Sequence, residues 1–262
     1  MIKKPVIAFL LDKKGGAIEL SYEELNNVNT NGKILWVHFD YSSPEAVDWI
    51  TNKSEIDSIA IDALLTEETR PRTTLLNDSI LIALRGVNLN PNSKPEDMVS
   101  IRLYISTHLI ISTRKRDILS VAEIIDILKK GIGPKSSSEF LTELIYRVTD
   151  RMEDVINQIE DRTNALEENL IDSTDLKFRN EILSVRREII ILRRYLFPQK
   201  EAMSKLYHDK VTWLTEYEKI ELRETNDQLM RYIEELDTIR DKVSLIQEIG
   251  RASCRERVSR TV

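Results

Sequence analysis

The chain has 262 residues, of which 41% are hydrophobic and 31% charged, and its formal net charge is -6. This length and hydrophobic content suffice for a folded core, and seven glycines plus seven prolines are too few for a loop-rich protein. The acidic balance, without a basic stripe interleaved with aromatic residues, argues against nucleic-acid binding. The single cysteine, Cys254, excludes a disulfide framework and a cysteine-based zinc cluster within one chain. No apolar run approaches the ~20 residues that cross a bilayer, so we expect the chain as given to be soluble.

Residues 1–134 alternate short strand and helix patterns. The expected strands are residues 5–11, 17–20, 34–39, 73–76, 80–87, 98–106 and 109–113. Helices are expected after the caps Ser21 and Ser43, and over residues 54–65 and 118–130. The first two strands form a hairpin and the last four an antiparallel meander. We therefore predict an α+β fold whose N-terminal α/β/α domain contains a mixed, largely antiparallel sheet.

Beyond residue 134 only helical patterns occur. Apolar residues near a 3.6 period predict one helix over 141–170 and a second from residue 175 onward, which together form a helical hairpin within residues 135–214 that turns at 172–174. The first helix is rich in acidic and the second in basic residues, so opposite charges are expected to face each other across the hairpin. A solvated face on each helix is the alternative, and a role of the acidic helix in attracting cations is the more specific hypothesis.

A long helix is expected over residues 215–249. Thr215 and Glu218 form a capping-box pattern at its start, and an end at Ile249 makes it about 50 Å long. A heptad seam follows the helix: Leu222, Thr225, Leu229, Tyr232, Leu236, Ile239, Val243 and Ile246. This seam predicts helix association, and two uses remain open: packing on the hairpin of the same chain, or a self-associating bundle. Residues 250–262 abandon the heptad and turn basic, so we expect a vector-derived tail there.

Catalytic motifs are absent from the sequence. There is no dinucleotide or phosphate-binding glycine loop, no G-x-S-x-G and no H-E-x-x-H, so we expect neither an enzyme nor a bound cofactor. His38, His108 and His208 are scattered and are interpreted as structural. Acidic pairs that could meet hydrated divalent cations through oxygen recur in the helices, with solvated faces as the alternative. These pairs are Glu153-Asp154, Glu160-Asp161, Glu167-Glu168 and Glu234-Glu235.

Several segments in a fixed order carry a family resemblance. They are residues 68–72 (ETRPR), 84–88 (LRGVN), 95–99 (PEDMV), 109–116 (LIISTRKR), 193–200 (RRYLFPQK) and 239–242 (IRDK). Together they resemble the cytosolic domain of CorA-type divalent-metal transporters of the ZntB, or zinc-transport, branch. The resemblance covers essentially residues 1–249. The outer-pore Gly-x-Asn motif and the membrane helices of that family are missing, so we expect that this chain alone does not transport.

The resemblance implies a soluble domain at the cytoplasmic face of a bacterial inner membrane. It implies a homopentameric funnel in which the long helices surround the ion path and lead into the first transmembrane helix. The transported ion is expected to be zinc, with Mg, Co, Ni or Cd as alternatives. We predict that acidic residues of the long helix, with Asp227, Glu234 and Asp241 as candidates, concentrate cations in the funnel and that stalk movement couples metal state to the pore.

Two other functions remain to be weighed. A soluble coiled-coil adaptor would explain the helices and the seam equally well, and it predicts no hydrophobic continuation after Ile249 in the gene. A metal-dependent hydrolase would require clustered ligands. Neither accounts for the ordered segments of the resemblance.

Overall fold

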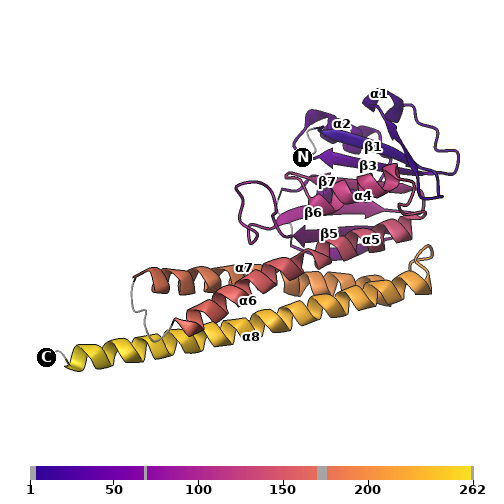
Figure 1. The fold of residues 1–262 in the computed structure, drawn as a ribbon. Coiled ribbons are helices and arrows are strands. Elements are labelled where there is room, and N and C mark those ends of the chain that lie inside the picture. Colours follow the sequence, from indigo (N-terminus) through magenta and orange to yellow (C-terminus); the bar gives the residue numbers. More distant parts are fainter. Residues whose placement is uncertain (1–3, 68–69, 170–175, 261–262) are drawn as a thin grey trace.

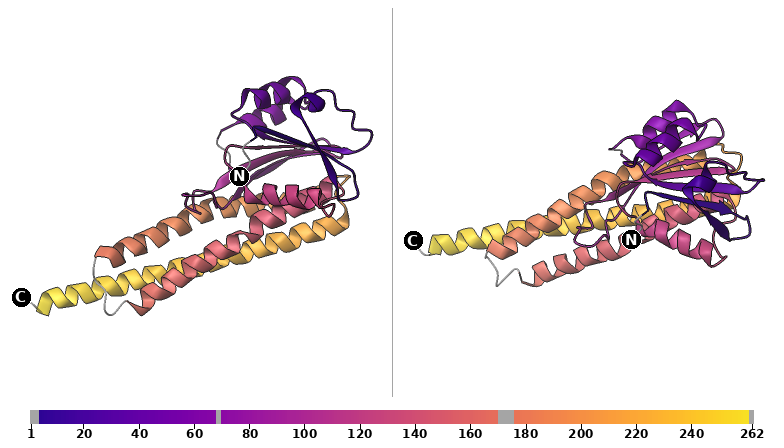
Figure 2. Two further views of the ribbon diagram at one scale, coloured as in Figure 1. Left: turned by 45° about the horizontal axis from the view of Figure 1, so that its top comes forward. Right: turned by 90° about the horizontal axis from the view of Figure 1, so that it is seen from above.

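The structure is a computed structural model that describes residues 4–67, 70–169 and 176–260. A sheet domain lies at one end, and long helices extend from it side by side (Figure 1). Figure 2 shows the same elongated shape from two further directions, with the C-terminus at the tip of the helical part. No helix among the described residues has an apolar stretch sufficient to cross a bilayer.

The sheet has seven strands in the order β2-β1-β3-β7-β6-β5-β4. All neighbours are antiparallel except β3 and β7, which are parallel. The strands are β1 Val6–Leu11, β2 Ala17–Leu20, β3 Ile34–Asp40, β4 Arg72–Leu76, β5 Ser79–Gly86, β6 Val99–Ile105 and β7 Leu109–Arg114. The predicted mixed, largely antiparallel sheet is confirmed, as is the meander from β4 to β7.

Local turn chemistry explains the first hairpin. The Asp12 carboxylate accepts hydrogen bonds from the backbone amides of Lys14 at 2.7 Å and Gly16 at 2.9 Å. Gly15 has a φ of +106°, and a Cβ there would lie 2.8 Å from the Gly131 carbonyl oxygen. Only glycine combines this φ with such a close approach, so the turn and its register depend on it.

Helices cover both faces of the sheet. One face carries α1 Tyr22–Leu25, α2 Pro44–Asn52 and α3 Ser58–Leu65, which enclose one apolar cluster with the sheet. The other face carries α4 Leu119–Lys129 and α5 Ser137–Asp150, whose apolar residues join a second cluster. The predicted α/β/α arrangement is therefore confirmed. The predicted caps also form: Ser21 makes a complete capping box with Glu24, and the Ser43 hydroxyl accepts from the Ala46 amide at 3.1 Å.

The helix expected over residues 54–65 begins four residues later. Ser54 closes the preceding helix instead, because its hydroxyl donates to the Ile50 carbonyl at 2.6 Å. Glu55 has a φ of +55°, which no helix interior adopts. Asp57 provides the N-cap of α3 by accepting from the Ile59 amide at 2.8 Å.

The helix expected over 141–170 is two helices. α5 ends at Asp150, and α6 Met152–Glu168 begins after Arg151. The Arg151 amide reaches the Arg147 carbonyl at a long 3.4 Å, and both arginine side chains bind Glu123 of α4. One distorted residue leaves the apolar period unchanged, so the sequence pattern could not reveal the interruption.

The remaining helices are α7 Leu176–His208 and α8 Glu216–Arg260. α8 has 45 residues and continues past Ile249, the expected end, to Arg260. This continuation says nothing about the origin of residues 250–262, and the proposed domain boundaries stay predictions. The turn expected at 172–174 lies outside the described residues.

The charges of α6 and α7 do not face each other as expected. Arg162, a basic residue of the acidic helix, binds Glu181 at 2.8 Å and Glu188 at 2.7 Å, two acidic residues of the basic helix. Arg193 of α7 instead binds Asp237 of α8 at 2.9 Å. The net charge of a helix therefore did not predict which of its side chains turn towards a neighbour.

The bundle is joined to the sheet through α7. The side-chain oxygen of Gln199, 1% exposed, accepts from the Arg85 amide at 2.7 Å. The Thr73 hydroxyl donates to the Ala202 carbonyl at 2.7 Å, and the Arg85 guanidinium lies 4.7 Å from the Tyr195 ring centre. The two contacts of Arg85 join residues 84–88 and 193–200, two of the segments that carry the resemblance, which lie far apart in sequence.

Candidate functional site

The start of α8 is anchored to α5. The Glu218 carboxylate accepts from the Thr215 amide at 2.9 Å, which is half of the expected capping box. Its other oxygen accepts from the Ser138 hydroxyl at 3.0 Å. Because Glu218 is buried, this pair of bonds fixes where the long helix leaves the sheet domain.

The predicted heptad seam is buried within the chain. All eight residues are at most 7% exposed: Leu222, Thr225, Leu229, Tyr232, Leu236, Ile239, Val243 and Ile246. Seven of them belong to the same apolar cluster as residues of α5, α6 and α7. In the structure the seam packs on the chain's own helices, which is the first of the two uses left open. The seam is therefore not available as a free surface for a self-associating bundle or a coiled-coil adaptor.

The two polar seam residues are satisfied inside this interface. The Thr225 hydroxyl donates to the Glu221 carbonyl at 2.9 Å. The Tyr232 hydroxyl accepts from Gln228 at 2.7 Å and donates to the Glu153 carboxylate of α6 at 3.3 Å. Burial is the main reason that the pKa of Tyr232 is raised to about 12. The Glu153 carboxylate acts in the same direction, and the Gln228 hydrogen bond acts in the opposite one. Tyr232 thus stays a neutral donor that holds α6 to α8.

The three candidate residues lie on the opposite, exposed face of α8. Asp227, Glu234 and Asp241 recur at seven-residue intervals, and Glu248 continues this row. Seven residues rise about 10.5 Å, so two neighbouring carboxylates of one chain cannot bind the same ion directly. Asp241 is bound by the adjacent Arg240 at 2.9 Å. The structure therefore aligns the candidates in one row, which we call the α8 row, without bringing them together.

Further carboxylates surround the contact of α6 with α8. Burial, followed by the nearby carboxylates of Glu160 and Glu153, raises the pKa of Glu235 above its ordinary value. The acidic pairs noted in the sequence thus meet in space, although Lys242 neutralises Glu167 and binds Asn164 at 2.8 Å. The result is an electronegative surface and not a chelating site. Among the described residues, no group of three or more His, Cys, Asp or Glu side chains is arranged to hold a metal ion.

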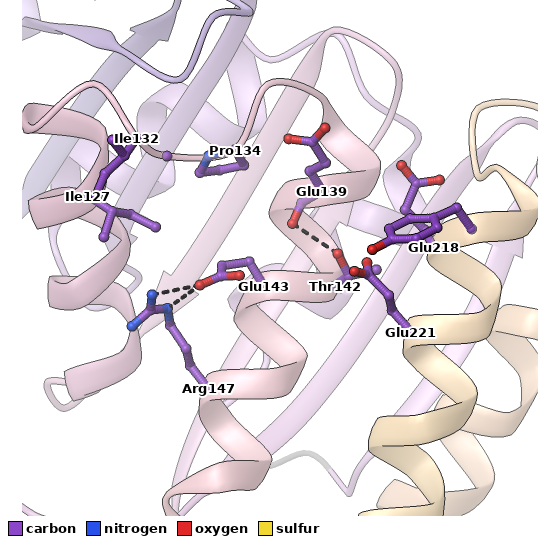
Figure 3. Close-up of a pocket in the computed structure, with 11 residues that line it drawn as sticks. Ile127, Ile132, Pro134, Glu139, Thr142, Glu143, Arg147, Glu218 and Glu221 are labelled. Carbon is purple, nitrogen blue, oxygen red and sulfur yellow. Dashed lines mark hydrogen bonds and ion pairs between the residues drawn. The ribbon is translucent and has the colours of Figure 1, made fainter.

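A groove of about 380 Å³ is lined by α4, α5, the loop between them and the start of α8 (Figure 3). Glu139 and Glu143 enter it from α5, and Glu218 and Glu221 from α8. Glu143 is paired with Arg147 at 2.6 Å. Sequence reasoning missed this groove, because the glutamates are visible in the sequence but the contact of α5 with α8 is tertiary.

The three histidines contribute no metal site. His38 is fully buried in β3, where its Nδ1 lies 2.8 Å from the Ser112 hydroxyl. Burial, and then the charge of Arg114, lowers the pKa of His38 to about 3. His108 and His208 are exposed. His38 is therefore a neutral core residue, in line with its structural interpretation.

Comparison with known proteins identifies the family. The family model described as CorA-like Mg2+ transporter protein matches residues 31–262. The chain belongs to the CorA family. The resemblance inferred from its short segments is thereby confirmed, and the matching model describes a family of transporters.

Two relatives of this CorA-family chain are similar to it over most of its length. The divalent cation transporter CmaX of Pseudomonas aeruginosa is 35% identical over 260 residues, covering 98% of this chain and 78% of the relative. The zinc transport protein ZntB of Yersinia enterocolitica is 30% identical over 237 residues, covering 90% of this chain and 71% of the relative. Both names therefore describe similar proteins, and only one specifies zinc.

Solved structures agree on the fold. The full-length CmaX protein superposes with a TM-score of 0.91 at 35% identity, covering 99% of this chain and 81% of that one. The ZntB cytoplasmic domain from Vibrio parahaemolyticus gives 0.81 at 24% identity, over 95% and 98% of the two chains. The soluble domain of CorA from Methanocaldococcus jannaschii gives 0.78 at 14% identity, over 96% and 99%. The last two matches establish the shared fold alone.

Proposed function

We propose that this chain is the cytoplasmic funnel of a divalent-cation transporter at a bacterial inner membrane, and that the transported ion is zinc. Family membership supports the class of function, and the name of the ZntB relatives supports the ion. The observation that supports the role as a funnel is the α8 row. Asp227, Glu234 and Asp241 stay exposed because α8 packs on the rest of the chain through its opposite face, the seam.

The row acts through long-range attraction. In a homopentamer with α8 around the ion path, each position of the row supplies five carboxylates at one level. Neighbouring levels are about 10.5 Å apart, close to the Debye length of about 8 Å at physiological ionic strength. The fields of successive levels therefore overlap, and a funnel lined by one sign of charge raises the local cation concentration. Weak, hydrated contacts of this kind let the ion move on instead of trapping it.

The same helix provides the route for regulation. α8 is one uninterrupted helix from Glu216 to Arg260, anchored to α5 through Glu218. A change in cation occupancy along its row alters the repulsion between copies of α8, and a rigid helix transmits the resulting displacement along its length. In this way metal state and pore state become coupled.

The test is zinc uptake by the complete transporter in cells. The triple variant Asp227→Asn, Glu234→Gln and Asp241→Asn is expected to lower uptake at sub-saturating zinc by about tenfold, the lower end of electrostatic steering effects. The loss should shrink at high ionic strength, because screening already weakens the field of the wild type.

The control carries the same change of charge elsewhere. Glu23→Gln, Glu45→Gln and Asp62→Asn alter exposed residues of α1, α2 and α3, and uptake should remain at the wild-type level. Equal uptake by the wild type and the α8-row variant would refute the role of the row. Uptake of magnesium but not zinc would refute the choice of ion alone.

A further inference from the structure

The outer face of α7 carries an apolar stripe that the bundle does not cover. Leu176, Leu183, Ile190 and Phe197 follow one another at seven-residue intervals and are 73%, 56%, 60% and 52% exposed. Arg187 and Arg194 are exposed on the same face, four residues after Leu183 and Ile190. These six residues, the α7 stripe, run for about 30 Å.

Large apolar side chains in a continuous exposed line mark an interaction surface. The buried residues of α7 lie on its other side and already satisfy the contact with α8 and the sheet. A sustained seven-residue interval is the spacing at which a helix presents a seam to another helix. The stripe therefore predicts a helical partner with negative charge.

α6 presents such a surface. Asp154, Asp161 and Glu168 are exposed and recur at the same seven-residue interval. Val155, Ile159 and the other buried residues of α6 lie on the opposite side of the helix and pack into the bundle. The three carboxylates therefore point away from the bundle. We call these three carboxylates the α6 row.

The α7 stripe and the α6 row lie at the same level along the bundle. Arg162, next to Asp161, binds Glu188, next to Arg187, at 2.7 Å. Asp161 and Arg187 therefore lie at the same height along the bundle, and each of them faces outward from its own helix. Seen from above, α6 and α7 lie on opposite flanks of α8 (Figure 2).

We propose that the α7 stripe of one copy of this chain docks on the α6 row of the next copy. The two surfaces differ, so the contact is heterologous. If each copy is rotated relative to the last about an axis along α8 and the rotations add up to a full turn, the copies form a closed ring. No shift along the axis is needed, because stripe and row are level. This inference rests on the self-association included in the proposed function, and it names the surfaces that associate.

A membrane is the less suitable partner for the stripe. A helix that binds a bilayer surface lies in the plane of the interface along its whole apolar face. α7 runs alongside α8 in all views (Figures 1 and 2), and the proposed function directs α8 towards the membrane. Most of the stripe would thus stand away from a bilayer surface, whereas it lies in position for a neighbouring bundle.

The test is charge reversal with rescue, read as the molar mass of the chain by light scattering over a range of protein concentrations. Arg187→Glu with Arg194→Glu, and separately Asp154→Arg with Asp161→Arg, should each weaken association at least tenfold. All four substitutions together should restore association to within about threefold of the wild type, because opposite charges face each other again. Circular dichroism reports whether each variant remains folded.

Two controls make the test specific. Lys94→Glu with Lys210→Glu gives the same change of charge at exposed sites outside the stripe and should leave association unchanged. Ile190→Ser should weaken association without any change of charge, since it removes part of the apolar surface.

Several outcomes would overturn the inference. They are a wild-type chain that is monomeric at all concentrations, an oligomer that ignores both reversals, and a fourfold variant that is no better than either reversal. Binding of the wild type to vesicles with anionic lipid, lost in the arginine variant without a change in mass, would assign the stripe to a membrane instead. Zinc uptake that depends on the α8 row, combined with an oligomer indifferent to these reversals, would leave the proposed function standing.

Discussion

Replacement of Leu236 by alanine tests whether the seam of α8 stabilises each chain from within. Leu236 is 0% exposed and belongs to the apolar cluster shared by the bundle and the sheet. The change removes three carbon atoms, worth about 2.4 kcal/mol of transfer free energy at about 0.8 kcal/mol each. The residual cavity adds to this, so the free energy of unfolding should fall by about 3–4 kcal/mol.

Leu245 provides the matched control on the same helix. Its side chain is 60% exposed, so Leu245→Ala should change the free energy of unfolding by less than about 0.5 kcal/mol. Urea denaturation followed by circular dichroism measures both variants, and several protein concentrations should be compared. The loss in Leu236→Ala should be the same at each concentration, because the contact is made within one chain.

A different pattern would refute this reasoning. If the seam joined separate chains, the deficit of Leu236→Ala would shrink as the protein concentration rises, since mass action would compensate for the lost contact. An equal loss in the two variants would mean that burial does not distinguish the two faces of α8.

Three further predictions follow from the sheet domain and its junction with the bundle. His38 has a folded-state pKa of about 3, below its ordinary value of 6.5, so it stabilises the fold fully above pH 6.5 and progressively less below it. Between pH 7.5 and 5 the wild type should therefore lose about 2 kcal/mol more than His38→Gln in urea titrations. Gln199→Met removes the acceptor of the Arg85 amide and should cost about 1–3 kcal/mol in the same assay, whereas Gln158→Met, on the exposed face of α6, should cost almost nothing. Gly15→Ala should lower the thermal midpoint by several degrees, because of its φ of +106° and the 2.8 Å approach of a Cβ to Gly131, and an unchanged midpoint would contradict the turn geometry.

Features that depend on neighbouring residues were predictable from the sequence. The capping box of Ser21 and Glu24 and the proline start after Ser43 need only side chains three residues away, and both form. The strands and their meander follow from apolar runs separated by turn residues. The predicted helix start at residue 54 was wrong, because the Ser54 hydroxyl bonds to the Ile50 carbonyl of the preceding helix and Asp57 provides the cap of α3.

The candidate site was predictable in position but not in arrangement. Heptad spacing correctly separated the apolar face of α8 from the face that carries Asp227, Glu234 and Asp241. It did not reveal that Glu235 lies beside Glu153 and Glu160, because those residues come from another helix. Nor did it reveal that Arg162 would bind acidic residues of α7, since ion pairs depend on helix rotation and height.

The sequence by itself determined the fold class, the long helix and the identity of its apolar and acidic faces. Periodicity is a local property of the chain, and burial enforces it at every turn. The tertiary structure alone decided what covers each face: the seam is buried within the chain, while the α8 row and the α7 stripe stay exposed. A periodic pattern indicates that one face of a helix must be buried. Which segment buries that face depends on packing among segments that are distant in sequence.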